Sequence, residues 1–345
     1  MKSNFRDSSL WFARMLGFVL LSLAALSGRA LAISQDIIEQ AKKEGEAVLY
    51  TTMPVGEFQI FNQAAKEKYP FLNIRHVRIN SGNQAPKVLL EHKAGKMQVD
   101  VIGNNLAAMR YFKEQGVLAK VDSPEISQLV RGSADPDGYW AGITSDLYIS
   151  AYNTKLLALD KVPRSFDDYL DPRWKDQIAV NRGVPDGLIG MLELRGEDKG
   201  MAYMRRLGRQ GLRPVDGFTH MTNLLAAGEY PLAIFMQVSK IDAMKKRGAP
   251  VSWLPTGPTL ATLCCIGVTK NAPHPASARL LMDFYLSVEG QRALTRAGKI
   301  PARRGIKSPS DDIDRLLDSG NLHVIRTEGE YSRYMKLYNE VLGTR

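Results

Sequence analysis

Cysteine is nearly absent from this chain of 345 residues, since only Cys264 and Cys265 occur and they are adjacent. Two neighbouring cysteines cannot link distant segments, and a bridge between them would be strained against normal disulfide geometry. The stretch "TLCCIGV" supplies no further metal ligand. We therefore expect two buried thiols in a strand, although an oxidising compartment leaves an adjacent-residue disulfide open.

The sequence also lacks the common motifs of catalysis. It contains no GxSxG elbow, no HExxH helix and no Walker-type phosphate loop. The histidines are far apart and show no ligand spacing; only His220 is placed near a ligand, where a surface or capping role competes. We predict binding without turnover, with no cofactor and no metal. A secreted enzyme on the same scaffold is the weaker alternative.

Long hydrophobic runs are absent except near the start, where "LGFVLLSLAALS" follows a basic segment and precedes "ALA". This pattern is typical of a secretory signal peptide, residues 1–32, cleaved after Ala32. The run is shorter than the roughly 20 apolar residues that a membrane span needs. We expect a soluble periplasmic protein, and the lack of a cysteine at the cleavage site argues against a lipid anchor.

Charge of one sign is not concentrated anywhere. The net charge is +10, and the expected signal peptide carries +3 of it, which leaves about +7 on the rest. The basic residues are scattered and no basic-aromatic motif occurs, so we expect no nucleic acid partner. The excess positive charge is compatible with an anionic ligand, although we favour a solvated surface as its explanation.

Strand and helix patterns alternate along the remaining chain. Short apolar runs such as "AVLYTTM", "VDVIGNN", "DQIAVNR" and "YPLAIFM" are each followed by a segment with helical spacing of apolar residues. This order predicts an α/β fold with mostly parallel sheets flanked by helices. No flexible linker is evident, so two lobes joined by strands are expected.

Polar residues follow the predicted strands at their carboxyl ends, where open α/β sheets bind ligands. Helix capping is the competing explanation for each position taken singly. The candidates at these five ends are Thr51 and Thr52, Ser81 with Gly82, Asn104 and Asn105, Asn181 and Arg182, and Gln237 with Ser239.

Several stretches, in this order and spacing, resemble the bacterial extracellular solute-binding proteins of ABC importers, in the ferric-ion-binding-like group. They include "LYTTMPVGEFQIFNQAAKEKYP", "VPRSFDDYLDPRWKDQIAV" and "LLAAGEYPLAI". The resemblance implies a type II periplasmic binding protein fold, with a ligand cleft between two lobes that closes by hinge motion. It implies residues 33–143 and 267–345 in one lobe, 144–266 in the other, and a membrane permease as the partner of a monomer.

Ferric binders of this family carry two adjacent tyrosines where this chain has Val238 and Ser239, and no adjacent tyrosine pair occurs anywhere. Rebuilding an iron site from Tyr230 or Glu57 is the weaker alternative. We expect a small anionic or zwitterionic solute, such as an organic acid, phosphonate or sugar phosphate, held by amides, hydroxyls and one arginine. A ligand sensor for a membrane histidine kinase remains the other alternative. The resemblance also implies ligand contacts at the loop that matches "TSDLY", where Ser145 and Asp146 lie, and Thr219 is a further expected contact.

Overall fold

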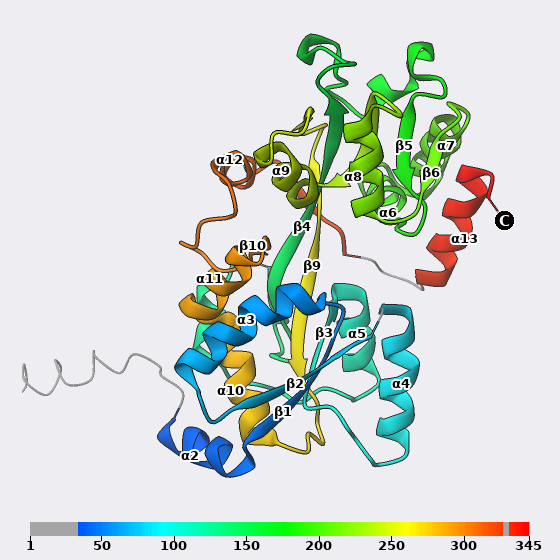
Figure 1. The fold of residues 1–345 in the computed structure, drawn as a ribbon. Helices are drawn as coiled ribbons and strands as arrows, with labels where there is room; N and C mark the ends of the chain where they lie inside the picture. Colours follow the sequence, from blue (N-terminus) through cyan, green and yellow to red (C-terminus); the bar gives the residue numbers. More distant parts are fainter. Residues whose placement is uncertain (1–33, 80, 131, 327–330, 345) are drawn as a thin grey trace, which may run out of the picture.

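The computed structural model describes residues 34–79, 81–130, 132–326 and 331–344. The expected signal peptide, residues 1–32, lies outside the described residues. Among the described residues, no helix combines the length and the apolar character that crossing a membrane requires. The described chain forms two lobes, one above the other in Figure 1.

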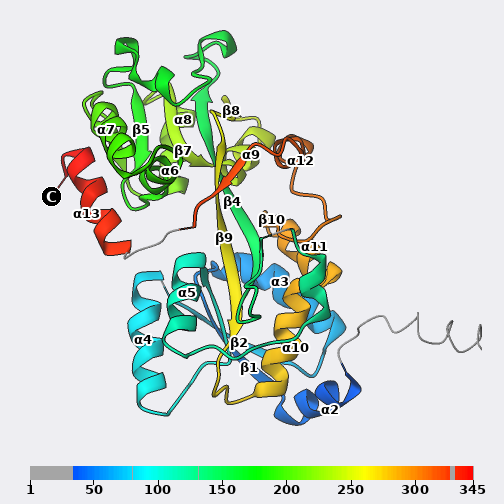
Figure 2. The same ribbon diagram turned by 180° about the vertical axis from the view of Figure 1, so that it is seen from behind.

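The first lobe is built on parallel pairing of β1 with β2 and of β1 with β3. Helices α4 and α5 lie on one face of these strands, and α3, α10 and α11 lie on the other (Figures 1 and 2). Its elements are α2 (Gln35–Glu44), β1 (Glu46–Thr51), α3 (Val55–Lys68), β2 (Asn73–Arg78), α4 (Ser81–Lys93), β3 (Val101–Asn105), α5 (Leu106–Glu114), the 3-10 helix η1 (Pro124–Gln128), α10 (Pro275–Leu286), α11 (Val288–Arg296) and β10 (Ile300–Pro301).

The second lobe is built on β5, which pairs in parallel with β6 and with β7. Four helices follow or precede these strands, and three short 3-10 helices lead into β5. Its elements are η2 (Leu159–Lys161), η3 (Asp167–Leu170), η4 (Pro172–Trp174), β5 (Ile178–Asn181), α6 (Asp186–Arg195), α7 (Glu197–Gly208), β6 (Arg213–Val215), α8 (Phe218–Ala227), β7 (Leu232–Gln237), α9 (Val238–Lys246) and β8 (Val251–Leu254).

Two long strands, β4 (Ala141–Asn153) and β9 (Thr259–Val268), run from one lobe into the other (Figure 1). They pair antiparallel with each other, β9 with β3 of the first lobe, and β4 with β7 of the second. We call β4 and β9 the connecting strands. The sheet order is β2-β1-β3-β9-β4-β7-β5-β6, so each lobe has parallel strands and the antiparallel pairs lie at the junction. The mixed α/β, two-lobed fold expected from the sequence is confirmed.

The last three elements are α12 (Asp311–Asp318), β11 (Leu322–Val324) and α13 (Tyr331–Leu342). Ile313 and Leu316 of α12 pack into the same apolar cluster as Met221 and Trp253 of the second lobe. Helix α13 packs against α7 and α6. Residues 267–345 were expected to join the first lobe together; α10 and α11 do, whereas the apolar faces of α12 and α13 are buried on the second lobe.

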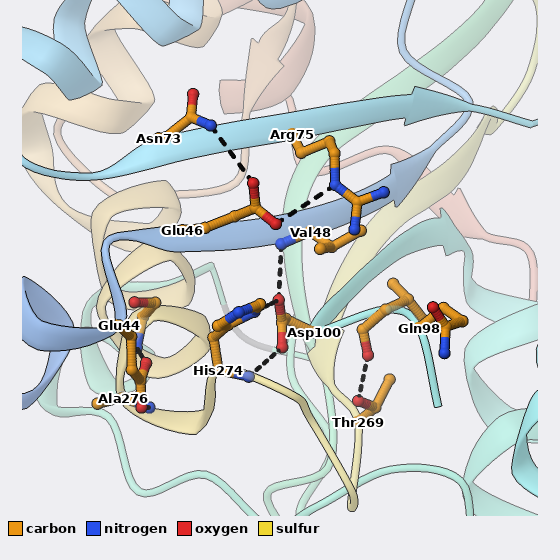
Figure 3. A network of polar contacts seen from close by, with 12 residues as sticks. Glu44, Glu46, Val48, Asn73, Arg75, Gln98, Asp100, Thr269, His274 and Ala276 are labelled. Atoms are coloured by element: carbon orange, nitrogen blue, oxygen red, sulfur yellow. Dashed lines mark hydrogen bonds and ion pairs between the residues drawn. The ribbon is translucent and has the colours of Figure 1, made fainter. Parts of the chain in front are cut away.

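A polar network surrounds Asp100, the residue before β3 of the first lobe (Figure 3). The carboxylate of Asp100, which is fully buried, accepts hydrogen bonds from the main-chain N–H groups of Val48 (2.7 Å) and His274 (2.7 Å). It also lies 2.9 Å from Nδ1 of the His274 ring. Glu44 accepts from the N–H groups of Ala276 and Ser277 at the start of α10. The network therefore joins β1, β3 and α10 at the end of the lobe that lies away from the second lobe.

Candidate functional site

Five ionisable acid and lysine side chains and one tyrosine, from both lobes, meet on one face of the connecting strands. Each comes from the first turn of a helix that follows a strand, from β4 itself, or from the turn before β10. We call them the interlobe cluster, and its members are Glu57 of α3, Asp146 and Tyr148 of β4, Asp186 of α6, Lys240 of α9, and Lys299.

Glu57 joins the two lobes. Its carboxylate lies 2.8 Å from Nζ of Lys299, which belongs to the first lobe, and 3.8 Å from Nζ of Lys240, which belongs to the second. The side chain of Glu57 is only 19% exposed, so these contacts are partly shielded from water. The ion pair with Lys240 is therefore a direct link across the interlobe space.

Asp146 lies in the middle of β4, next to both lysines. Burial raises the pKa of this carboxyl, and the charges of Lys299 and Lys240 oppose that rise. Burial alone would lower the pKa of the Lys299 ammonium, but the carboxylates of Asp146 and Glu57 outweigh burial and raise it. Lys299 thus stays protonated, and its ammonium group interacts with both carboxylates, Asp146 and Glu57.

Tyr148 and Asp186 form the second half of the cluster. The phenol of Tyr148 donates a hydrogen bond of 2.5 Å to Oδ2 of Asp186, the first residue of α6. Burial raises the pKa of Asp186 to about 6, which is unusually high for an aspartate. Burial, together with the neighbouring carboxylates Asp186 and Asp146, raises the pKa of Tyr148 as well. Asp186 therefore changes charge near neutral pH.

Alternation along the strands decides which further side chains share this face. In the register of the connecting strands, Thr144 lies opposite Cys264, and Asp146 lies opposite Thr262. Asn105 of β3 lies opposite Cys264 on its other side. Hydroxyl, amide and thiol groups thus continue the polar face toward the first lobe, where charged groups are replaced by neutral ones.

The chain also matches a known family in sequence. The model of the family described as bacterial extracellular solute-binding protein matches residues 99–326, which is 228 of the 345 residues. The chain belongs to this family. It is thus an extracellular or periplasmic solute-binding protein, with a small-molecule ligand and a membrane ABC permease as its partners.

Two relatives of the solute-binding protein are similar in sequence. An uncharacterised Haemophilus influenzae protein is 24% identical over 290 residues, which cover 79% of this chain and 82% of the relative. A Salmonella typhimurium protein named for the binding of 2-aminoethylphosphonate is 24% identical over 190 residues, covering 52% of this chain and 56% of the relative. These alignments extend over half of the chain or more.

Solved structures confirm the two-lobed fold. Iron-bound HitA from Pseudomonas aeruginosa has a TM-score of 0.74 at 20% identity, covering 86% of this chain and 99% of that one. AfuA from Actinobacillus pleuropneumoniae, with fructose-6-phosphate bound, has a TM-score of 0.67 at 22% identity, covering 86% and 96%. One fold therefore serves both kinds of cargo, and the fold alone does not select between them.

Of the twelve expected ligand contacts, Asp146 lies in the interlobe cluster and Asn105 on its face. The carboxamide oxygen of Asn105 accepts from the N–H of Ala108, so it also caps α5. Thr51 is buried and its hydroxyl accepts from the N–H of Met53, while Thr52 is half-buried. Both threonines precede the helix that carries Glu57.

Two expected contacts point away from the interlobe cluster because of strand alternation. Asn104, beside Asn105, is fully buried against α4, where its amide donates to the carboxamide oxygen of Gln84 (2.6 Å). Ser145, beside Asp146, lines a cavity on the opposite face of the connecting strands. Adjacent residues of a strand cannot both face one ligand.

The remaining expected contacts lie on the second lobe or at the start of α4. Asn181 is buried and its side chain accepts from the N–H of Gly183, whereas Arg182 is exposed and paired with Asp216. Thr219 and its neighbour His220 are exposed on α8. Half-buried Gln237 and Ser239 flank the start of α9, beside Lys240; Ser81 begins α4, and its side chain lies outside the described part of the chain.

The alternative iron site would use Tyr230 or Glu57, and the hydroxyl of Tyr230 is already hydrogen-bonded in the second lobe. The phenol of Tyr230 is buried and donates to the main-chain oxygen of Met221 (2.6 Å), and Glu57 is held by two lysines. Within the described residues, no group of three or more His, Cys, Asp or Glu side chains is arranged to hold a metal ion.

Sequence reasoning missed Lys240, Lys299, Tyr148 and Asp186. Reading each strand end for one or two residues stops before the first helical turn, where Lys240 and Asp186 lie. Their position early in helices that follow strands was a usable signal. The sequence gives no such signal for Lys299, because this lysine reaches the interlobe cluster from a turn far along the chain.

Proposed function

We propose that this solute-binding protein captures a small solute that carries both an anionic group and an amine or hydroxyl donor, without chemical turnover. The observation that carries the proposal is the mixed charge of the interlobe cluster, with carboxylates and ammonium groups from both lobes within one site. Lysines favour an anion, whereas buried acids need a donor. A zwitterion or a sugar phosphate has both groups.

The helices that start at this site support the anionic part. The first turns of α3, α6 and α9 point free N–H groups toward the interlobe space, as helix N-termini do in anion sites. The Salmonella relative named for 2-aminoethylphosphonate and the AfuA structure with fructose-6-phosphate are consistent with such a ligand. The closed protein would then deliver the solute to its permease.

Isothermal titration calorimetry on the purified protein tests the proposal with matched ligands. 2-Aminoethylphosphonate and fructose-6-phosphate carry an anion and a donor, whereas ethylphosphonate has no amine. We expect at least one of the first two to bind, and ethylphosphonate to bind at least tenfold more weakly than 2-aminoethylphosphonate. Tight binding of ferric ion, with no binding of these compounds, would overturn the proposal and favour the iron alternative.

A pair of variants tests whether the ligand binds at the interlobe cluster. Asp146→Asn removes a half-buried acid of the cluster, while Asp137→Asn removes an acid that is 61% exposed and pairs with Lys113 of α5. We expect Asp146→Asn to lower the affinity for the ligand about tenfold or more, which is the usual effect of losing a charged hydrogen-bond partner. Equal affinity of both variants would exclude the cluster as the site. Mass spectrometry of the solute before and after incubation with the protein would reveal any turnover.

A further inference from the structure

A second hollow lies on the face of the connecting strands that is opposite to the interlobe cluster. It encloses about 670 Å³, within the range of small-molecule sites. Ser145 and Leu147 of β4 and Leu263 of β9 line it. Asp146 and Tyr148 face the other way, because side chains alternate along a strand. We call this hollow the rear cavity, and it shares no lining residue with the interlobe cluster.

The rear cavity has an apolar floor. Leu147 and Leu263 are buried in the connecting strands, and Leu106 and Trp140 add apolar surface from the first lobe. Leu317 of α12 contributes from the side that packs on the second lobe. An apolar body placed here would be removed from water, which favours binding in proportion to the area covered.

The rim of the rear cavity is cationic. Its lining includes five cationic side chains and two carboxylates, 5 − 2, a net of +3: Arg110, Arg303, Arg304, Lys307 and Arg326 against Asp314 and Asp318. Within the described chain, Arg110, Arg304 and Arg326 form no ion pair with a carboxylate. Arg110 and Arg304 donate instead to main-chain oxygens, those of Arg326 and Ser127. These guanidinium charges remain available to an anion.

We propose that the rear cavity is a second ligand site, which takes an amphipathic organic anion. The apolar body lies against Leu106, Leu147 and Leu263, and the carboxylate, sulfonate or phosphate lies at Arg304 and its cationic neighbours. A floor without charge and a rim with excess positive charge match that one ligand class better than a sugar or a free inorganic ion. The walls come from both lobes, so the shape of the site depends on how the lobes are arranged.

The dye 8-anilinonaphthalene-1-sulfonate is a suitable probe, because it combines an aromatic body with one sulfonate and fluoresces in apolar surroundings. Titration of the purified protein should show saturable binding of one dye per chain. The uncharged analogue N-phenyl-1-naphthylamine should bind at least tenfold more weakly. Equal binding of both dyes, or many weak dye sites, would overturn the proposal.

Variants locate the dye. Ser145→Trp fills the rear cavity and should weaken dye binding at least tenfold, and Arg304→Glu, on the exposed rim, should weaken it about fivefold or more. Arg292→Glu changes an equally exposed arginine that does not line the cavity and should leave binding unchanged. Arg304→Glu keeps the test decisive if Ser145→Trp folds poorly.

A third variant separates the two sites. Asp146→Asn alters the interlobe cluster and should leave the dye affinity unchanged within about twofold. If Asp146→Asn changes dye binding while Arg304→Glu does not, the dye occupies the interlobe site and the rear-cavity proposal is wrong.

Discussion

The charge of Asp186 is set by burial at the start of α6, where Tyr148 is its hydrogen-bond donor. Its pKa in the folded protein is about 6, against an ordinary value of 3.8. Between these two values the folded protein holds a proton that the unfolded chain releases. The free energy of unfolding therefore falls as the pH rises through this window, by about 3 kcal/mol for two pKa units.

Asp186→Asn removes this titration. Between pH 4 and pH 7 the free energy of unfolding of the parent should fall by about 3 kcal/mol from this group, and that of the variant should not. The difference between variant and parent should therefore change by about 3 kcal/mol in favour of the variant. Urea unfolding at the two pH values measures the difference. Asp216→Asn, at an exposed acid paired with Arg182, serves as the control. Identical pH dependence of the two variants would show that Asp186 titrates normally.

Single residues show how well the sequence predicted which side chains face the interlobe cluster. Of the residues expected at strand ends, Asn105 lies on the face of the interlobe cluster, and Asp146, which the family resemblance implied, lies within the cluster. Their neighbours Asn104 and Ser145, expected on the same two grounds, have side chains that point to the other face. The strand bounds do not reveal the face, since that depends on which helices cover the sheet. Lys299 shows the other limit, because its partner Glu57 is distant in sequence.

At the scale of elements, alternation of strands and helices was readable. Helices α10 and α11 follow the strand β9 and are separated at Ser287. The hydroxyl of Ser287 caps the second helix by accepting from the N–H of Gly290, a local signal that can be read from sequence. The extent of β4 could not be read, because its polar residues interrupt the apolar pattern.

The hydrogen bonds of Asp100 in Figure 3 join elements far apart in sequence, so their loss should weaken the first lobe as a unit. Asp100→Ala leaves the buried N–H of Val48 and the partly buried N–H of His274 without their acceptor. Unpaired buried donors cost about 1–3 kcal/mol each, so for the two donors we expect a loss of roughly 2–6 kcal/mol in the free energy of unfolding.

Glu46→Ala is the matched control for Asp100→Ala. Glu46 contacts Arg75 and Asn73 at the surface, and its side chain is 32% exposed. Exposed pairs contribute about 0–1 kcal/mol, so this variant should be nearly as stable as the parent. Urea unfolding of both variants measures the difference. Similar losses in the two would mean that the Asp100 network is not a structural joint.

At the scale of the whole molecule, the connecting strands and a few side-chain contacts hold the lobes in their arrangement. The ion pair between Glu57 and Lys240 crosses the interlobe space at 3.8 Å, with side chains 19% and 35% exposed. Such a partly exposed pair contributes about 1 kcal/mol or less, enough to change a ratio of two arrangements by up to about fivefold. A solute that brings its own charges to Lys240 would compete with Glu57 for it.

Lys240→Gln removes the link across the lobes, so the ligand-free variant should favour a more open arrangement and have a larger radius of gyration in small-angle X-ray scattering. Lys245→Gln changes another lysine of α9, whose partner Asp312 packs on the same lobe, and should scatter like the parent. If a bound solute closes the lobes, Lys240→Gln should also bind it more weakly, since closure then begins from a more open state. Superimposable scattering of the parent and both variants would mean that Glu57 and Lys240 do not set the lobe arrangement, and that the connecting strands alone do.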